Sequence, residues 1–80
     1  MACLLLGAAP VLAADPVAGR TAAAACAECH EPGDWEGETQ PSLESLIRDV
    51  VRGAVKHSRQ ITLSDAEIAN IAAYWASASR

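Results

Sequence analysis

The sequence is poor in the large aromatic side chains that usually fill a small protein core. Its 80 residues include no phenylalanine, one tyrosine and two tryptophans, and much of the 51% hydrophobic content is alanine. A chain of this size buries only about 60% of its unfolded surface. Below roughly 70–80 residues, such a core usually needs a covalent or metal staple to be stable. We therefore expect the chain to contain one.

Positive charge is also scarce. The sequence has six lysines and arginines and ten aspartates and glutamates, which gives a net charge of −4. Proteins that coat nucleic acid bind mainly by neutralising phosphates with Lys and Arg. The composition therefore argues against a nucleic-acid partner.

The first fourteen residues contain no charged side chain. They form an apolar run that continues through Pro10 into small residues, which is the pattern of a secretory signal peptide and its cleavage site. The run is too short to span a membrane, which takes about 20 apolar residues. No Lys or Arg precedes it, so we expect the true translation start to lie upstream or to be misassigned.

We predict a signal peptide over residues 1–14, whose removal discards Cys3, and a mature domain over residues 15–80 without stable membrane insertion. The alternative is that residues 1–14 form a buried helix of the domain. Export would place the remaining cysteines in an oxidising compartment, where a pair forms a disulfide or binds a cofactor.

Local signals predict a helix at each end of the mature domain. Asp15 can cap a helix that begins at Pro16, and an alanine-rich run continues this helix to Ala25. Ser64 and Glu67 have the spacing of a capping box, which predicts the start of the last helix.

An apolar stripe predicts a third helix between these two. Apolar residues recur at steps of three and four, at Leu43, Leu46, Ile47, Val50, Val51, Ala54 and Val55. Residues 31–40 and 57–62 are expected to be loops, and no alternating pattern typical of strands is present. The sequence therefore predicts an all-α domain of three helices.

The chemistry is concentrated in residues 26–30, which read Cys-Ala-Glu-Cys-His. Two thiols three positions apart at a helix end can both form thioethers with the vinyl groups along one edge of a porphyrin. His30 is then placed to bind the iron. This spacing is the accepted sign of c-type haem attachment, and it predicts one covalently attached haem c per chain.

Three other interpretations of the motif stay open. A Cys26–Cys29 disulfide would close a very short loop. A thioredoxin-like redox pair expects a βαβ setting, which the pattern does not predict. A zinc site needs four ligands, and without Cys3 the only Cys and His residues are Cys26, Cys29, His30 and His57.

Further features match one protein family. Gly19 stands seven residues before Cys26, Tyr74 and Trp75 form an aromatic pair, residues 63–68 read Leu-Ser-Asp-Ala-Glu-Ile, and residues 41–43 read Pro-Ser-Leu. In this order and spacing, residues 15–78 resemble a class I cytochrome c of the small bacterial periplasmic kind.

The resemblance implies a small three-helix domain wrapped around one haem. It implies that the first and last helices cross closely at Gly19. It also implies that the carbonyl of Pro41 accepts a hydrogen bond from the ring of His30 and thereby fixes the tautomer of this ligand.

One departure concerns the second iron ligand, which is methionine in this family. The only methionine is Met1. The family spacing, counted from Gly53 and from Leu63, leads to His57, so we predict that His30 and His57 hold the iron. An imidazole in place of a thioether lowers the reduction potential. The alternatives are that His57 points to water, that Lys56 binds the iron, or that the sixth position is open.

The resulting expectation is a periplasmic electron carrier and not an enzyme, which exchanges electrons with other redox proteins as a monomer or as a subunit of a redox complex. The alternative is a haem protein that binds or senses a small ligand, or reduces peroxide, through an open sixth position. Trp35 is expected to cover the haem. Two groups of charged residues either steer partners or form an ordinary solvated surface. One is the acidic residues after the motif, and the other is the basic stripe Arg48, Arg52, Lys56 and Arg59.

Overall fold

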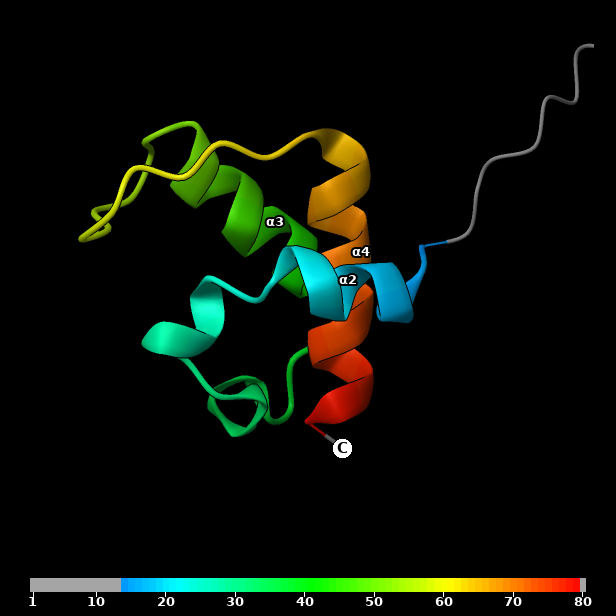
Figure 1. Cartoon of the computed structure of the whole chain (residues 1–80). Helices are drawn as coiled ribbons and strands as arrows, with labels where there is room; N and C mark the ends of the chain where they lie inside the picture. The colour runs from blue at the N-terminus through cyan, green and yellow to red at the C-terminus, as the bar shows by residue number, and fades with distance from the viewer. Residues whose placement is uncertain (1–13, 80) are drawn as a thin grey trace, which may run out of the picture.

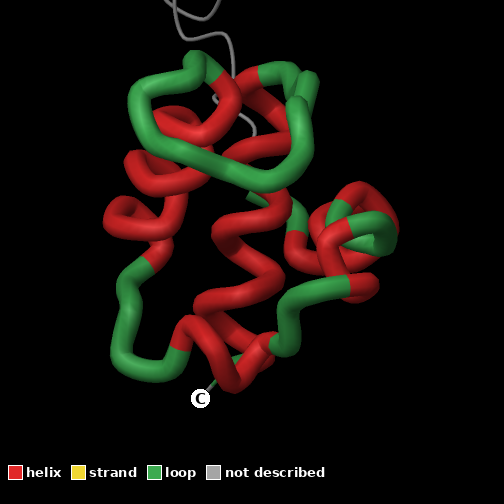
Figure 2. The backbone as a smooth tube through the Cα atoms, turned by 90° about the vertical axis from the view of Figure 1, so that its left-hand side faces the viewer, coloured by secondary structure: helices red, strands yellow, loops and turns green. Residues whose placement is uncertain are grey.

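The computed structural model describes residues 14–79, and over this range it is entirely helical. Helix α2 spans Pro16–Ala22, α3 spans Gln40–Val51 and α4 spans Asp65–Ala78, while the short 3-10 helices η1 (Cys26–Glu28) and η2 (Pro32–Trp35) lie between α2 and α3 (Figure 1). Loops join these helices, and no strand is present in the described part of the chain (Figure 2). The predicted three-helix, all-α class is confirmed. The predicted signal peptide lies, apart from Ala14, outside the described residues.

The first and last helices cross in direct backbone contact. In Figure 1, α2 lies across the middle of α4. Gly19 is buried at this crossing, and a Cβ atom built on it would overlap the carbonyl group of Asn70. The backbone N–H of Asp15 also donates to Oδ1 of Asn70 at 2.8 Å. The crossing predicted at Gly19 is therefore present.

The helices begin where local side chains satisfy their free N–H groups. The Asp15 carboxylate accepts from the N–H groups of Val17 and Ala18, as predicted. At the start of α4, the Ser64 hydroxyl accepts from the N–H of Glu67 at 3.1 Å, and the Glu67 carboxylate accepts from the N–H of Ser64 at 2.9 Å. The predicted capping box is confirmed.

Helices α2 and α3 both end sooner than the sequence predicts. Helix α2 ends at Ala22 and not at Ala25, because the chain tightens there into i→i+3 hydrogen bonds such as that from the N–H of Ala24 to the carbonyl of Thr21. Helix α3 ends at Val51, so that Val55 lies in a loop.

Gly53 is the physical reason for the end of α3. It has a φ of +79°, and its N–H donates to the carbonyl of Val50, while the N–H of Ala54 donates to the carbonyl of Asp49. These two bonds form a Schellman motif, which ends a helix by satisfying its last carbonyls. The long segment from Arg52 to Ser64 therefore leaves the helix as a loop, which projects away from α3 and returns to α4 in Figure 1.

The core is small and is centred on α4. Its buried hydrophobic residues are Ala23, Leu43, Ile47, Ile68, Ile71, Ala72, Trp75 and Ala76. Trp35 packs at its edge with its ring 4.4 Å from that of Trp75, centroid to centroid. No helix within residues 14–79 is long and apolar enough to cross a membrane.

We predict that Gly19→Ala destabilises the protein, because the new methyl group has to displace the backbone of α4 at Asn70. Forced overpacking of this kind costs about 1–3 kcal/mol, so we expect a loss near the upper end, measured as the free energy of unfolding in urea. Gly33→Ala is the matched control, since nothing lies within 4 Å of its Cβ position and its φ is ordinary. Equal unfolding free energies for the two variants would contradict a close crossing.

Candidate functional site

A large apolar cavity opens beside the core. Its volume of about 570 Å³ lies within the range of roughly 300–1,000 Å³ that is typical of small-molecule and cofactor sites. Helices α3 and α4 and the loop before α4 supply its apolar wall, which includes Leu46, Ile47, Val50, Leu63 and Ile71. Leu46 is 42% exposed. The cavity therefore presents apolar surface that nothing in the described chain covers.

The Cys-x-x-Cys-His segment forms one side of this cavity. Cys26, Cys29 and His30 all line it, and both thiols are free. The tight turn of η1 brings the three together, because the N–H groups of Cys29 and His30 both donate to the carbonyl of Cys26, at 3.1 and 2.8 Å. Burial raises the pKa of the Cys26 thiol, and a backbone hydrogen bond partly offsets this increase. The side chain of Cys29 is exposed.

His57 lines the same cavity from the loop between α3 and α4. The centroid of its ring lies 6.3 Å from that of His30, and the two ring planes differ by 27°. Twenty-seven positions of chain, including all of α3, separate the two residues. The structure therefore brings together His30 and the histidine that the family resemblance selected as its partner.

Hydrogen bonding leaves Nε2 of His57 as the free ring nitrogen. Its Nδ1 lies 2.8 Å from the carbonyl oxygen of Arg59. Because a carbonyl oxygen can only accept, we assign the proton to Nδ1, and this shorter contact outweighs the N–H of Arg59 at 3.3 Å. Nε2 then keeps the lone pair that binds a metal.

Asp34 occupies the corresponding position beside His30. Its Oδ2 lies 3.5 Å from Nδ1 of His30 and accepts the backbone N–H of Glu31 at 3.0 Å, which fixes the carboxylate. A carboxylate at Nδ1 favours the proton there and leaves Nε2 free.

Pro41, which the family resemblance assigns to this position, lies exposed in the first turn of α3 and does not line the cavity. The structure therefore does not bring Pro41 together with His30. Asp34 was not among the predicted site residues, although its place four residues after His30, on a turn that begins with Pro32, was a usable signal.

Trp35 contributes a buried donor without an acceptor. It lines the cavity, its ring centroid lies 5.2 Å from that of His30, and its Nε1 is buried with no hydrogen-bond partner in the structure. Such a group costs about 1–3 kcal/mol when it is left unsatisfied.

The remaining charged residues take separate roles. Lys56 lines the cavity next to His57. Arg48 lies 3.9 Å from Asp65, Arg52 lies 2.7 Å from Asp49, and Arg59 lies 2.9 Å from Glu28. The basic residues therefore do not form one continuous helix face, because α3 ends before Arg52.

Within residues 14–79, no group of three or more His, Cys, Asp or Glu side chains is arranged to hold a bare metal ion.

Comparisons of the chain with protein-family models, with curated proteins and with solved structures found no match. The function of this site is therefore inferred from its own residues and their geometry.

Proposed function

We propose that this chain is an exported, periplasmic electron-transfer protein that carries one haem, attached covalently through Cys26 and Cys29, with His30 and His57 as the residues that would hold its iron. The observation that carries the proposal is the 6.3 Å separation of the two imidazole centroids across an apolar cavity. Metal–imidazole bonds are about 2 Å long, so two rings bound end-on to one ion have centroids about 6 Å apart. The 6.3 Å separation of the two rings matches this distance, which supports one iron held by both histidines.

The residues of the cavity have distinct roles in this proposal. His30 and His57 would hold the iron through Nε2, because Asp34 and the carbonyl of Arg59 contact their Nδ1 atoms. Trp35, whose ring lies beside that of His30, would cover the cofactor on this side of the cavity. The apolar wall excludes water from the metal. The haem supplies a one-electron redox couple at its iron.

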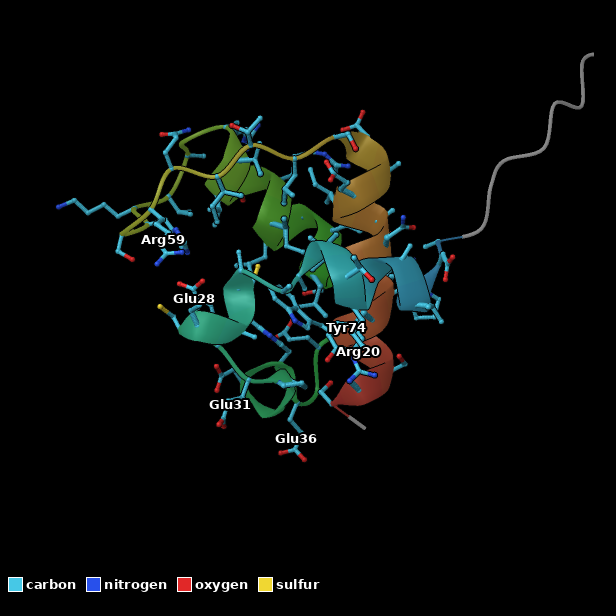
Figure 3. All side chains as sticks on the ribbon, viewed as in Figure 1. Arg20, Glu28, Glu31, Glu36, Arg59 and Tyr74 are labelled. Carbon is cyan, nitrogen blue, oxygen red and sulfur yellow. The ribbon has the colours of Figure 1, made fainter. Side chains whose placement is uncertain are left out.

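The surface beside the motif suits a brief encounter with another redox protein. Glu28, Glu31 and Glu36 are exposed on the segment around η1 and η2 (Figure 3). Acidic side chains near the exposed Cys29 would steer a partner with a basic surface, and this effect weakens as salt is added.

A second candidate function is the reversible binding of a small ligand at the iron. The observation that favours it is the exposure of every residue from Arg52 to Gln60, the segment that carries His57. Departure of this loop would remove His57 and open the sixth position. The two candidates therefore differ in how firmly the loop holds His57.

We expect the purified periplasmic protein to give a pyridine haemochrome spectrum of c type and an intact mass equal to the processed chain plus one haem. Replacement of both Cys26 and Cys29 by serine should abolish the covalent mass increase. It should also leave the chain largely unfolded by circular dichroism, because the small core then lacks its staple. A colourless wild-type protein with the mass of bare polypeptide would refute the proposal.

We expect His57→Ala to convert a low-spin, six-coordinate visible spectrum into a high-spin one, because the iron loses its second imidazole. Binding of carbon monoxide to the reduced protein should become at least tenfold faster. Lys56→Ala is the control, since Lys56 is the neighbouring cavity residue and the competing ligand. An unchanged low-spin spectrum in His57→Ala, with a changed one in Lys56→Ala, would transfer the ligand role to Lys56.

We expect Asp34→Asn to raise the reduction potential. The carboxylate beside Nδ1 strengthens the donation of His30 to ferric iron, and the amide removes this charge while it can still accept the N–H of Glu31. The shift should be some tens of millivolts, since about 59 mV corresponds to a tenfold change in a one-electron equilibrium. Glu36→Gln removes the same charge from the same segment, and an equal shift in that control would mean that only the overall charge matters.

A further inference from the structure

His57 lies on a loop that has little burial to hold it. Each residue from Arg52 to Gln60 is exposed, so packing against the core cannot set the position of the ring. Specific polar contacts have to do so instead. Two such contacts involve the same residue, Arg59.

The first contact is made by the backbone of Arg59. Its carbonyl oxygen lies 2.8 Å from Nδ1 of His57, two residues earlier in the chain. This bond directs the ring and selects the tautomer with a free Nε2. It acts within the loop and therefore does not determine where the loop lies relative to His30.

The second contact is made by the side chain of Arg59 and crosses to the opposite side of the cavity. Its Nη2 donates to Oε1 of Glu28 at 2.9 Å, although 31 positions of chain separate the two residues. Figure 3 shows the Arg59 side chain reaching from the loop toward the Glu28 carboxylate on η1. Because Glu28 lies between Cys26 and Cys29, the pair ties the loop of His57 to the segment that carries His30.

The pair is well placed to control a position and poorly placed to stabilise the fold. The two side chains are 56% and 61% exposed, and exposed ion pairs contribute little to overall stability. The hydrogen bond that Arg59 donates to Glu28 raises the pKa of Arg59 further, so the guanidinium stays charged. Added salt is then the simplest means of weakening the pair.

We propose that Arg59 is a positioning residue that holds His57 across the cavity from His30, with its carbonyl orienting the ring and its guanidinium fastening the loop to Glu28. This inference rests on the proposed function, in which His57 is an iron ligand. It implies an equilibrium between a fastened loop and a released loop. The observed rate at which an external ligand reaches the iron is proportional to the released fraction.

The test measures carbon monoxide binding to the reduced, haem-loaded protein by stopped-flow absorbance. Carbon monoxide is neutral, so salt and charge substitutions do not alter its approach. We expect Arg59→Gln and Glu28→Gln each to speed binding about two- to fivefold at low ionic strength, as the loss of an exposed ion pair allows. We expect the exchanged pair Glu28→Arg with Arg59→Glu to restore the wild-type rate.

Arg52→Gln is the matched control. It removes one positive charge from the same loop, but its partner Asp49 lies in α3 and the pair does not cross the cavity. We expect its binding rate and its unfolding free energy to equal those of the wild type. The unfolding free energy of Arg59→Gln should also be unchanged, which separates a positioning role from a merely structural one.

Salt gives a second measurement that needs no variant. The wild-type rate should rise with ionic strength and approach that of Arg59→Gln, whose own rate should be nearly independent of salt. A rate for Arg59→Gln equal to that of Arg52→Gln at low salt would overturn the positioning role alone, provided that the spectrum shows two histidine ligands. A protein without haem, or a low-spin spectrum that survives His57→Ala, would instead overturn the proposed function and this inference together.

Discussion

The contact on which the rest of the structure depends is the crossing of α2 over α4 at Gly19. Because glycine has no Cβ, the backbone of α2 rests directly on the backbone of α4 at Asn70. The side chain of Asn70 also accepts the N–H of Asp15 and so holds the beginning of α2. These two contacts fix α2 against α4. The chain then leaves α2 at Ala23, which is buried in the core. Cys26 follows and lines the cavity together with Ile71 and Trp75 of α4.

The core is small and has an open side. Three of its eight buried hydrophobic residues are alanines, and the largest fully buried side chains are Leu43, Ile68 and Ile71. Leu46 and Val55 line the cavity and each remain 42% exposed. A cofactor that fills the cavity would cover these side chains and complete the core. Binding and folding would then be coupled, because the bound form alone has a full hydrophobic interior.

The parts of the fold that sequence predicts well are those decided by neighbouring residues. The starts of α2 and α4 follow from Asp15, Ser64 and Glu67, whose side chains bond the backbone within three positions. Helix ends are harder, because the apolar stripe of α3 continues in register to Val55 after the helix has ended at Val51. Gly53 carries the deciding signal there, since its left-handed backbone overrides a periodicity that would otherwise extend the helix.

The candidate site also has parts that the sequence predicts and parts that it does not. Cys26, Cys29 and His30 lie within five residues in sequence, and the family resemblance selected His57, which lines the same cavity. The resemblance gave Pro41 as the partner of His30, and no partner of His57 was predicted, because these contacts depend on how the short turns after each histidine close. Asp34 reaches Nδ1 of His30 through the turn of η2, whereas Pro41 is carried away at the exposed start of α3.

The two candidate functions share one cavity and one proposed haem, so the helical framework cannot choose between them. What differs is the free energy that keeps the segment from Arg52 to Gln60 over the cavity. In the proposed haem protein, a firmly held His57 would stay bound to the iron, which suits electron transfer. A weakly held His57 would admit an outside ligand. The helices set the place of His30, but a single solvent-exposed ion pair between Arg59 and Glu28 bears on the place of His57. In this proposal, the choice between the two functions therefore lies in the exposed segment from Arg52 to Gln60.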